Sequence, residues 1–221
     1  MTRTDQGYSI CDQMFERADM LRTIERLSAI ARTKAGARHV LKVPTVRELA
    51  NDQRLVDIAS RFVGPTPVVF RATLFDKSRS ANWLVVWHQD TALPLRRRLD
   101  DPEWGPWSTK AGVLYAHAPA WALERVIALR VSLDDSTMSN GPLRVLPNTH
   151  RRGVLDDEQI KRLVTASAAV DCVTPSGGVV AMRPLTVHAS SKSTSDQPRR
   201  VLHIEYAASV DFGSGLELAV G

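Results

Sequence analysis

Hydrophobic residues follow two different patterns along the chain, and the pattern changes near residue 66. In the first part, apolar side chains recur every three or four positions, which is the spacing of one face of a helix: Met14, Ala18, Leu21 and Ile24. This spacing predicts a helix over residues 9–34, with Gly36 as its C-terminal glycine. Thr45 and Glu48 have the spacing of a capping box, so a second helix is expected from there to Gly64.

From residue 67 onward, short runs rich in β-branched and aromatic residues alternate with turn-forming residues. These runs predict strands at 68–75, 83–87, 113–116, 125–133, 143–146, 169–173, 179–182 and 200–206, with a short helix near 158–166. Helices followed by about eight strands predict a mainly β protein with N-terminal helices, a cupin-like double-stranded β-helix or jelly-roll barrel. We expect one domain over residues 1–221, in which 1–65 form a helical support and 66–210 form the jelly-roll core.

Composition excludes several classes of protein. Hydrophobic residues make up 43% of the 221 positions and charged residues 24%, which is typical of a globular protein. The net charge of +5 gathers in short basic runs at 96–98, 151–152 and 199–200, without a nucleic-acid-binding motif, so small anions are the expected partners. Cys11 and Cys172 stand far apart, and no long apolar segment occurs. A cytoplasmic protein that binds neither nucleic acid nor membrane is predicted, while the oligomeric state is not indicated.

The candidate chemistry begins at His88-Gln-Asp90, which is followed one hundred positions later by His188. Residues two apart on a strand point to the same side, so His88 and Asp90 can face one metal ion. Two imidazoles and one carboxylate are the ligand set that holds Fe(II) on one triangular face, with three adjacent positions left for a 2-oxo acid and O₂. Alone, the triplet is weak evidence, because a single histidine on a strand is more often structural.

A bound 2-oxo acid also needs a cation at its far end, since an unpaired buried carboxylate costs several kcal/mol. Arginine suits this role because its planar fork donates two parallel hydrogen bonds to a carboxylate. Arg199 and Arg200 are adjacent, so only one of them can face the interior of a strand-built barrel. The spacing from His188 favours Arg199, and the same parity places Val201 and His203 on the inner face.

Together these motifs resemble the phytanoyl-CoA dioxygenase family of Fe(II)/2-oxoglutarate oxygenases over roughly residues 67–208. The resemblance rests on His88-Gln-Asp90, on the segment 140–150 (NGPLRVLPNTH), and on His188 followed eleven positions later by Arg199. The family usually has Pro-Gly-Ser-His where this chain has residues 147–150, a difference that concerns a turn near the site.

The resemblance assigns a role to each motif residue. It implies that iron is bound by His88, Asp90 and His188. It further implies that Arg199 binds the distal carboxylate of 2-oxoglutarate and that Ser190 supplies a hydroxyl group beside that arginine. Fe(II), 2-oxoglutarate and O₂ are therefore the expected cofactor and co-substrates.

Residues that contact the prime substrate are harder to select. The segment 91–110 follows the metal motif and has the length of a lid. Trp104 and Trp107 are candidates to line a site for an apolar substrate, and the basic run 96–98 is a candidate to attract an anionic group. An equally good interpretation is that the two tryptophans attach the segment to the barrel. Lys77 either meets a carboxylate or is a rim charge, and His117 is a candidate to line the pocket.

The predicted function is an Fe(II)- and 2-oxoglutarate-dependent dioxygenase that hydroxylates an unactivated C–H bond of a small, anionic or neutral, molecule and releases succinate and CO₂. A halogenase would need a small residue in place of Asp90. Two alternatives stay open: a cupin-type metal enzyme that does not use 2-oxoglutarate, against which Arg199 argues, and a non-catalytic barrel that binds a small acid. The sequence does not identify the prime substrate.

Overall fold

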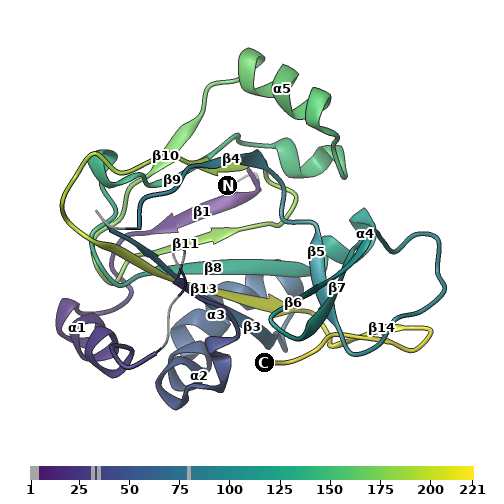
Figure 1. Ribbon diagram of the computed structural model, residues 1–221, viewed down its shortest axis with the longest axis horizontal. Coiled ribbons are helices and arrows are strands. Elements are labelled where there is room, and N and C mark those ends of the chain that lie inside the picture. Colours follow the sequence, from purple (N-terminus) through teal and green to yellow (C-terminus); the bar gives the residue numbers. More distant parts are fainter. Residues whose placement is uncertain (1–4, 31–32, 34–35, 79–80) are drawn as a thin grey trace.

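Two antiparallel β-sheets face one another in this computed structural model, which describes residues 5–30, 33, 36–78 and 81–221 (Figure 1). The larger sheet has six strands in the order β1-β11-β8-β13-β3-β2. Their bounds in that order are Tyr8–Cys11, Val179–Met182, Val126–Ser132, Arg199–Ala207, Val68–Lys77 and Gly36–Ala37. The smaller sheet has the order β10-β9-β12-β4, with bounds Val170–Cys172, Leu143–Val145, His188–Ser190 and Val85–His88.

The sheets pack through apolar side chains at one end and leave the other end for polar groups. Leu143, Val145 and Cys172 of the smaller sheet pack against Val180 and Met182 of the larger one. A third sheet has the order β5-β7-β6, with bounds Ala92–Leu95, Val113–His117 and Trp107–Lys110, and the hairpin of β14 (Asp211–Gly213) and β15 (Leu216–Glu217) lies beside it. The arrangement is the predicted mainly β jelly roll.

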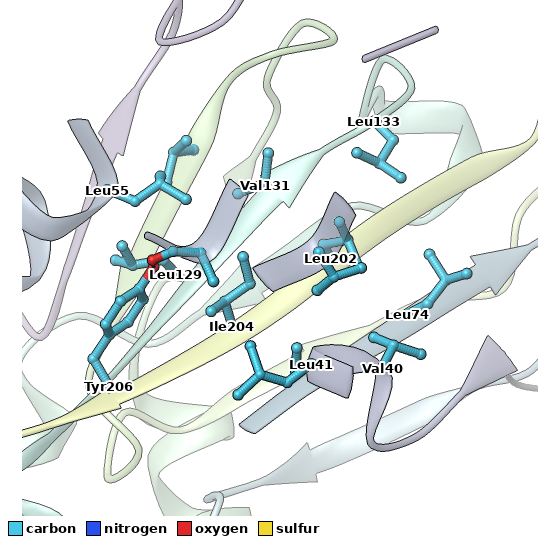
Figure 2. Packing of buried hydrophobic residues seen from close by; sticks show 14 of the residues in the cluster. Val40, Leu41, Leu55, Leu74, Leu129, Val131, Leu133, Leu202, Ile204 and Tyr206 are labelled. Carbon is cyan, nitrogen blue, oxygen red and sulfur yellow. The ribbon is translucent and has the colours of Figure 1, made fainter. Parts of the chain in front are cut away.

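Three helices cover the outer face of the larger sheet: α1 (Arg17–Arg26), α2 (Pro44–Ala50) and α3 (Gln53–Val63) (Figure 1). Alternate side chains of the central strands enter this helical layer, as Figure 2 shows for Leu129 and Val131 of β8 and for Leu202 and Ile204 of β13. They pack against side chains from the helical segment, among them Leu55. Because side chains alternate between the faces of a strand, the intervening residues of β8 and β13 must face the space between the two sheets.

The remaining helical segments are short. The bounds are Val40–Lys42 for η1, Ala120–Leu123 for α4, Met138–Asn140 for η2, Thr149–Arg152 for η3 and Asp157–Ala166 for α5. Helix α5 was predicted, and the Asp156 carboxylate caps it by accepting a hydrogen bond from the Gln159 N–H at 2.7 Å. Within the described ranges, no helix combines the length and the apolarity needed to cross a membrane.

The predicted helix over residues 9–34 is wrong at both ends, and residues 31, 32 and 34 of it lie outside the described residues. Residues 8–11 form β1, which pairs with β11 far along the chain, and α1 ends at Arg26. Gly36 lies in β2 with φ +121°, and a Cβ there would approach the Leu74 carbonyl oxygen to 1.9 Å. Glycine is therefore required at this position by the neighbouring strand and not by a helix end.

The predicted second helix is also interrupted. Its N-cap is Val43, with Pro44 in the first turn, so Thr45 and Glu48 do not form the expected capping box. Helix α2 ends at Ala50, and α3 begins after Asp52, whose carboxylate accepts a hydrogen bond from the Arg54 N–H at 3.0 Å. A true N-cap inside the predicted helix thus divides it into two.

Candidate active site

The three predicted metal ligands meet where β4 ends and β12 begins. His88 is the last residue of β4 and His188 the first of β12, and the two are paired across the ladder, with ring centroids 4.2 Å apart. Asp90 follows two residues after His88, and its N–H donates to the Pro184 carbonyl oxygen at 3.0 Å. Strand pairing therefore brings together side chains one hundred positions apart in the sequence.

Hydrogen bonds orient both imidazoles toward one point. Nδ1 of His88 lies 2.8 Å from the Val86 carbonyl oxygen, and Nδ1 of His188 lies 2.9 Å from that of Thr186. Since a carbonyl oxygen only accepts, each Nδ1 carries a proton, so in the neutral ring Nε2 has the lone pair that can bind a metal ion. The Asp90 carboxylate oxygens lie 3.6 Å from Nε2 of His88 and 3.5 Å from Nε2 of His188.

The protonation of these groups suits a metal ion. One ligand atom from each residue lies within 4.8 Å of the others, and two nitrogens with one carboxylate oxygen are the donor set of mononuclear Fe(II) sites. Burial lowers the pKa of His188 to about 4, against the opposing effect of Asp90, so this ring is neutral at neutral pH. Burial tends to raise the pKa of Asp90, but the histidines outweigh it and hold that pKa well below its usual value. A neutral imidazole and an ionised carboxylate are the forms that bind metals.

The ligands open into a cavity of about 350 Å³ between the two sheets. Its floor is formed by the inward-facing residues of β3, β8 and β13. Arg199 lies on this floor with 3% of its surface exposed, whereas Arg200 points to the opposite side and forms an ion pair with Asp134 at 2.7 Å. The predicted strand parity is confirmed, and His203 lies on the inner face as expected.

A buried cationic group occupies one end of the cavity. The Arg199 guanidinium donates to the Asn140 carbonyl oxygen at 3.1 Å and lies 3.3 Å from the Ser190 hydroxyl oxygen, which also accepts from Nζ of Lys77 at 2.9 Å. Among the described residues, no carboxylate forms an ion pair with Arg199 or Lys77. Buried cations without a counter-ion fit the distal carboxylate of a 2-oxo acid.

Lys77 is not the rim charge that the sequence left open. Only 1% of its surface is exposed, because it lies beneath Ser190 and also donates to the Ser191 carbonyl oxygen at 2.6 Å. Burial, Arg199 and Arg130 lower the pKa of Lys77 to about 7. Gly141 closes over this end with φ +70°, where a Cβ would lie 2.2 Å from the Ser191 carbonyl oxygen.

The centre of the floor carries a row of polar and charged side chains, of which the sequence analysis had placed only His203. Nη1 of Arg130 lies 3.1 Å from Nδ1 of His203, and Nε2 of the same histidine lies 3.9 Å from the Glu205 carboxylate. Glu205 in turn forms an ion pair with Arg71. Arg130 lies inside the strand predicted at 125–133, and its side chain faces the cavity.

The other end of the cavity is also basic. It is lined by Arg38, Arg71, Lys110, Tyr115 and His117, the last of which pairs through Nδ1 with the Thr91 hydroxyl group at 2.7 Å. His117 thus lies where the sequence placed it, in the wall of the pocket.

Trp104 and Trp107 lie outside the cavity. Trp104 is 3% exposed and packs against Trp121 and Phe212, with ring centroids 6.1 and 6.2 Å away, and Trp107 packs on the same cluster. The segment 91–110 is not an open lid, because its ends form β5 and β6. It contacts the cavity through Thr91, Ala92 and Lys110. The tryptophans attach the segment to the fold, which is the second of the two interpretations that the sequence allowed.

Comparison with known proteins agrees with this arrangement. The family model for phytanoyl-CoA dioxygenase (PhyH) matches residues 4–201, so the chain belongs to that family. An L-proline trans-4-hydroxylase of Streptomyces griseoviridis is 25% identical, over 69% of this chain and 59% of that protein, so the chain spans about three fifths of its relative's length.

Two solved structures share the fold. EctD from S. alaskensis superposes with a TM-score of 0.70 and 19% identity, covering 97% of this chain and 81% of its own. The non-heme alpha ketoglutarate dependent epimerase SnoN from nogalamycin biosynthesis gives a TM-score of 0.67 and 19% identity, covering 93% and 79%.

Proposed function

We propose that the protein is an Fe(II)- and 2-oxoglutarate-dependent oxygenase that hydroxylates a small molecule. The observation that carries this proposal is the position of His88, Asp90 and His188 in the same cavity as Arg199, a buried arginine without a carboxylate partner among the described residues. Bound Fe(II), with 2-oxoglutarate and O₂, supplies the oxidation of an unactivated C–H bond, and the co-substrate leaves as succinate and CO₂.

Each residue of the site has a distinct task. His88, Asp90 and His188 hold the metal, and the backbone carbonyl groups behind the histidines keep their Nε2 atoms aimed at it. Arg199 and Ser190 receive the distal carboxylate of 2-oxoglutarate, while Lys77 adds positive charge from beneath.

The alternatives from the sequence are less well supported. A cupin-type enzyme without 2-oxoglutarate would have no use for Arg199, whose burial without a counter-ion costs free energy. A non-catalytic acid-binding barrel would not need two imidazoles whose lone pairs converge on a carboxylate. Asp90 in the ligand set favours hydroxylation over halogenation. The cavity volume and the likeness to a proline hydroxylase support a substrate of amino-acid size. Cytoplasmic location stays a prediction.

The test is succinate formation by the protein with Fe(II), ascorbate and 2-oxoglutarate, across a library of amino acids and other small acids that includes L-proline. We expect slow succinate formation without a library compound and faster formation with some of them, and neither with His188→Ala. Oxidation of a library compound without 2-oxoglutarate would establish the cupin-type alternative. Absence of both succinate formation and metal binding would establish the non-catalytic one.

A further inference from the structure

We propose that the basic end of the cavity away from Arg199 binds a carboxylate of the prime substrate, which is held between Lys110 and Arg71 with Arg38 at the rim. This inference rests on the proposed function, because it assigns the substrate class of that same site. The position of this carboxylate-binding site also determines which part of the substrate faces the metal.

Positive charge exceeds negative charge at this end. Arg38, Arg71 and Lys110 all line the cavity, and Glu205 neutralises only one of them. Among the described residues, no carboxylate forms an ion pair with Arg38 or Lys110. Burial lowers the pKa of Lys110, and Arg38 and Arg71 lower it further, against the smaller opposing effect of Asp90, so the cations at this end repel one another. A substrate carboxylate would relieve this repulsion.

Tyr115 sets the spacing of the two main cations. Nζ of Lys110 lies 5.2 Å from the Tyr115 ring centroid, and Cζ of Arg71 lies 5.4 Å from it. The ring is 1% exposed, so it holds both cations beside one another and is not itself an open contact surface. Two neighbouring cations at one end of a small cavity suit the carboxylate of a compact organic acid.

Glu205 positions Arg71 for this task. Nε and Nη2 of the Arg71 guanidinium contact the Glu205 carboxylate, Nη1 lies 3.5 Å from the Ala92 carbonyl oxygen, and the Tyr115 hydroxyl group also interacts with the guanidinium. The guanidinium is therefore held in place by the protein, with 13% of the side chain still exposed, so little side-chain entropy is lost when a ligand binds it.

The register of β3 and β13 separates this end from the co-substrate end. Arg199 pairs with Lys77, and Glu205 pairs with Arg71, six residues further along β13. At roughly 3.3 Å per residue, the two ends lie about 20 Å apart along the strand. A five-carbon 2-oxo acid that is bound at Arg199 cannot also reach Arg71. The cations at the Arg71 end are therefore available to bind a second anion.

The same register indicates which carbon is oxidised. His203 lines the cavity together with the three metal ligands and lies two residues from Glu205 along β13. A carboxylate held by Arg71 is therefore about 7 Å along the sheet from the floor beneath the metal ligands. Oxidation is expected several bonds away from the carboxylate and not at the carbon next to it.

The experiment compares free acids with their primary amides in parent protein and in Lys110→Gln. The probes are L-proline and other amino acids of similar size, each as acid and amide. Binding is measured by calorimetry with the Mn(II)- and 2-oxoglutarate-loaded protein, and turnover by succinate formation with Fe(II). The matched control is Arg96→Gln, a cation of the same segment that pairs with Glu217 at 2.8 Å and does not line the cavity.

We expect the acids to bind the parent protein about tenfold or more tightly than their amides, and Lys110→Gln to weaken the acids by about tenfold while changing the amides little. The expected kinetic signature is a raised KM for the acids at nearly constant kcat, with no such change in Arg96→Gln. Equal affinity for acids and amides, equal weakening of both by Lys110→Gln, or no binding of any acid would overturn the inference. Failure of succinate formation alone, with acid-selective binding intact, would instead overturn the proposed function.

Discussion

Replacement of Arg199 by methionine tests the co-substrate site most directly, because methionine keeps much of the side-chain volume and removes the charge. The guanidinium is 3% exposed and lies beside the hydroxyl group of Ser190, in the position proposed for the distal carboxylate. Loss of one partner of a buried, hydrogen-bonded charge pair costs about 2–5 kcal/mol. The affinity for 2-oxoglutarate is therefore expected to fall by about 30-fold to several thousandfold.

The free energy of unfolding is expected to change much less than the affinity. Burial and the nearby Arg130 lower the pKa of Arg199, so the uncharged replacement removes an unfavourable cation from the unliganded protein. It also leaves the Asn140 carbonyl oxygen without its donor, at a cost of about 1–3 kcal/mol. Because these two effects oppose one another, we expect a net change of about 1–2 kcal/mol or less.

Calorimetric titration of 2-oxoglutarate into the Mn(II)-loaded protein measures the affinity, and urea denaturation measures the stability. The control is Arg200→Met, which removes the ion pair with Asp134 on the other side of β13. That variant is expected to lose about 1 kcal/mol of stability or less and to bind 2-oxoglutarate like the parent protein. A larger loss of affinity in Arg200→Met than in Arg199→Met would refute the strand-parity argument.

Three further outcomes are expected. His88→Ala leaves two ligands and should purify without stoichiometric iron or manganese by elemental analysis, while circular dichroism stays unchanged; full metal content would contradict the ligand assignment. The affinity for 2-oxoglutarate should decrease as the pH rises through about 7, because a bound dianion favours the protonated form of Lys77, whose pKa burial lowers to about 7. Calorimetry on Lys77→Met should show that this dependence is lost. Trp104→Ala should cost about 3–5 kcal/mol of stability in urea denaturation and leave the ratio of acid to amide KM unchanged, since the ring lies in a core cluster.

The positions of His88, Asp90 and Arg199 in the cavity could be predicted because each depends on a local rule. His88 and Asp90 are two positions apart, so their side chains lie on one side of an extended chain regardless of which strands pair with it. Along β13, side chains alternate between the two faces, and this alternation places Arg199 and not Arg200 in the cavity. These rules need no knowledge of the partner strand. The partner of His88 across the ladder, His188, came from the family motif and not from periodicity, since no strand was predicted at 188–190.

Features that depend on long-range pairing were predicted poorly. Residues 8–11 are a strand only because β11, some 170 positions later, offers an edge to pair with, so their helical periodicity was misleading. The sequence did not place the charged residues Arg71 and Glu205 in the cavity floor, for a related reason. Arg71 and Glu205 each look like an isolated interruption of an apolar strand, and only the register between β3 and β13 shows that they oppose one another.

In the proposed enzyme, the small sheet β5-β7-β6 would separate the choice of substrate from the activation of oxygen. It supplies Lys110, Tyr115 and His117 to the cavity, yet it contributes none of the proposed ligands of iron or of 2-oxoglutarate. A tight hairpin at Ala111 and Gly112, both with positive φ, joins β6 to β7, and β7 also pairs with β5. In the proposed enzyme, substitutions at the cavity-facing positions of residues 107–117 are therefore expected to change the substrate preference while the oxidising half of the cavity stays intact.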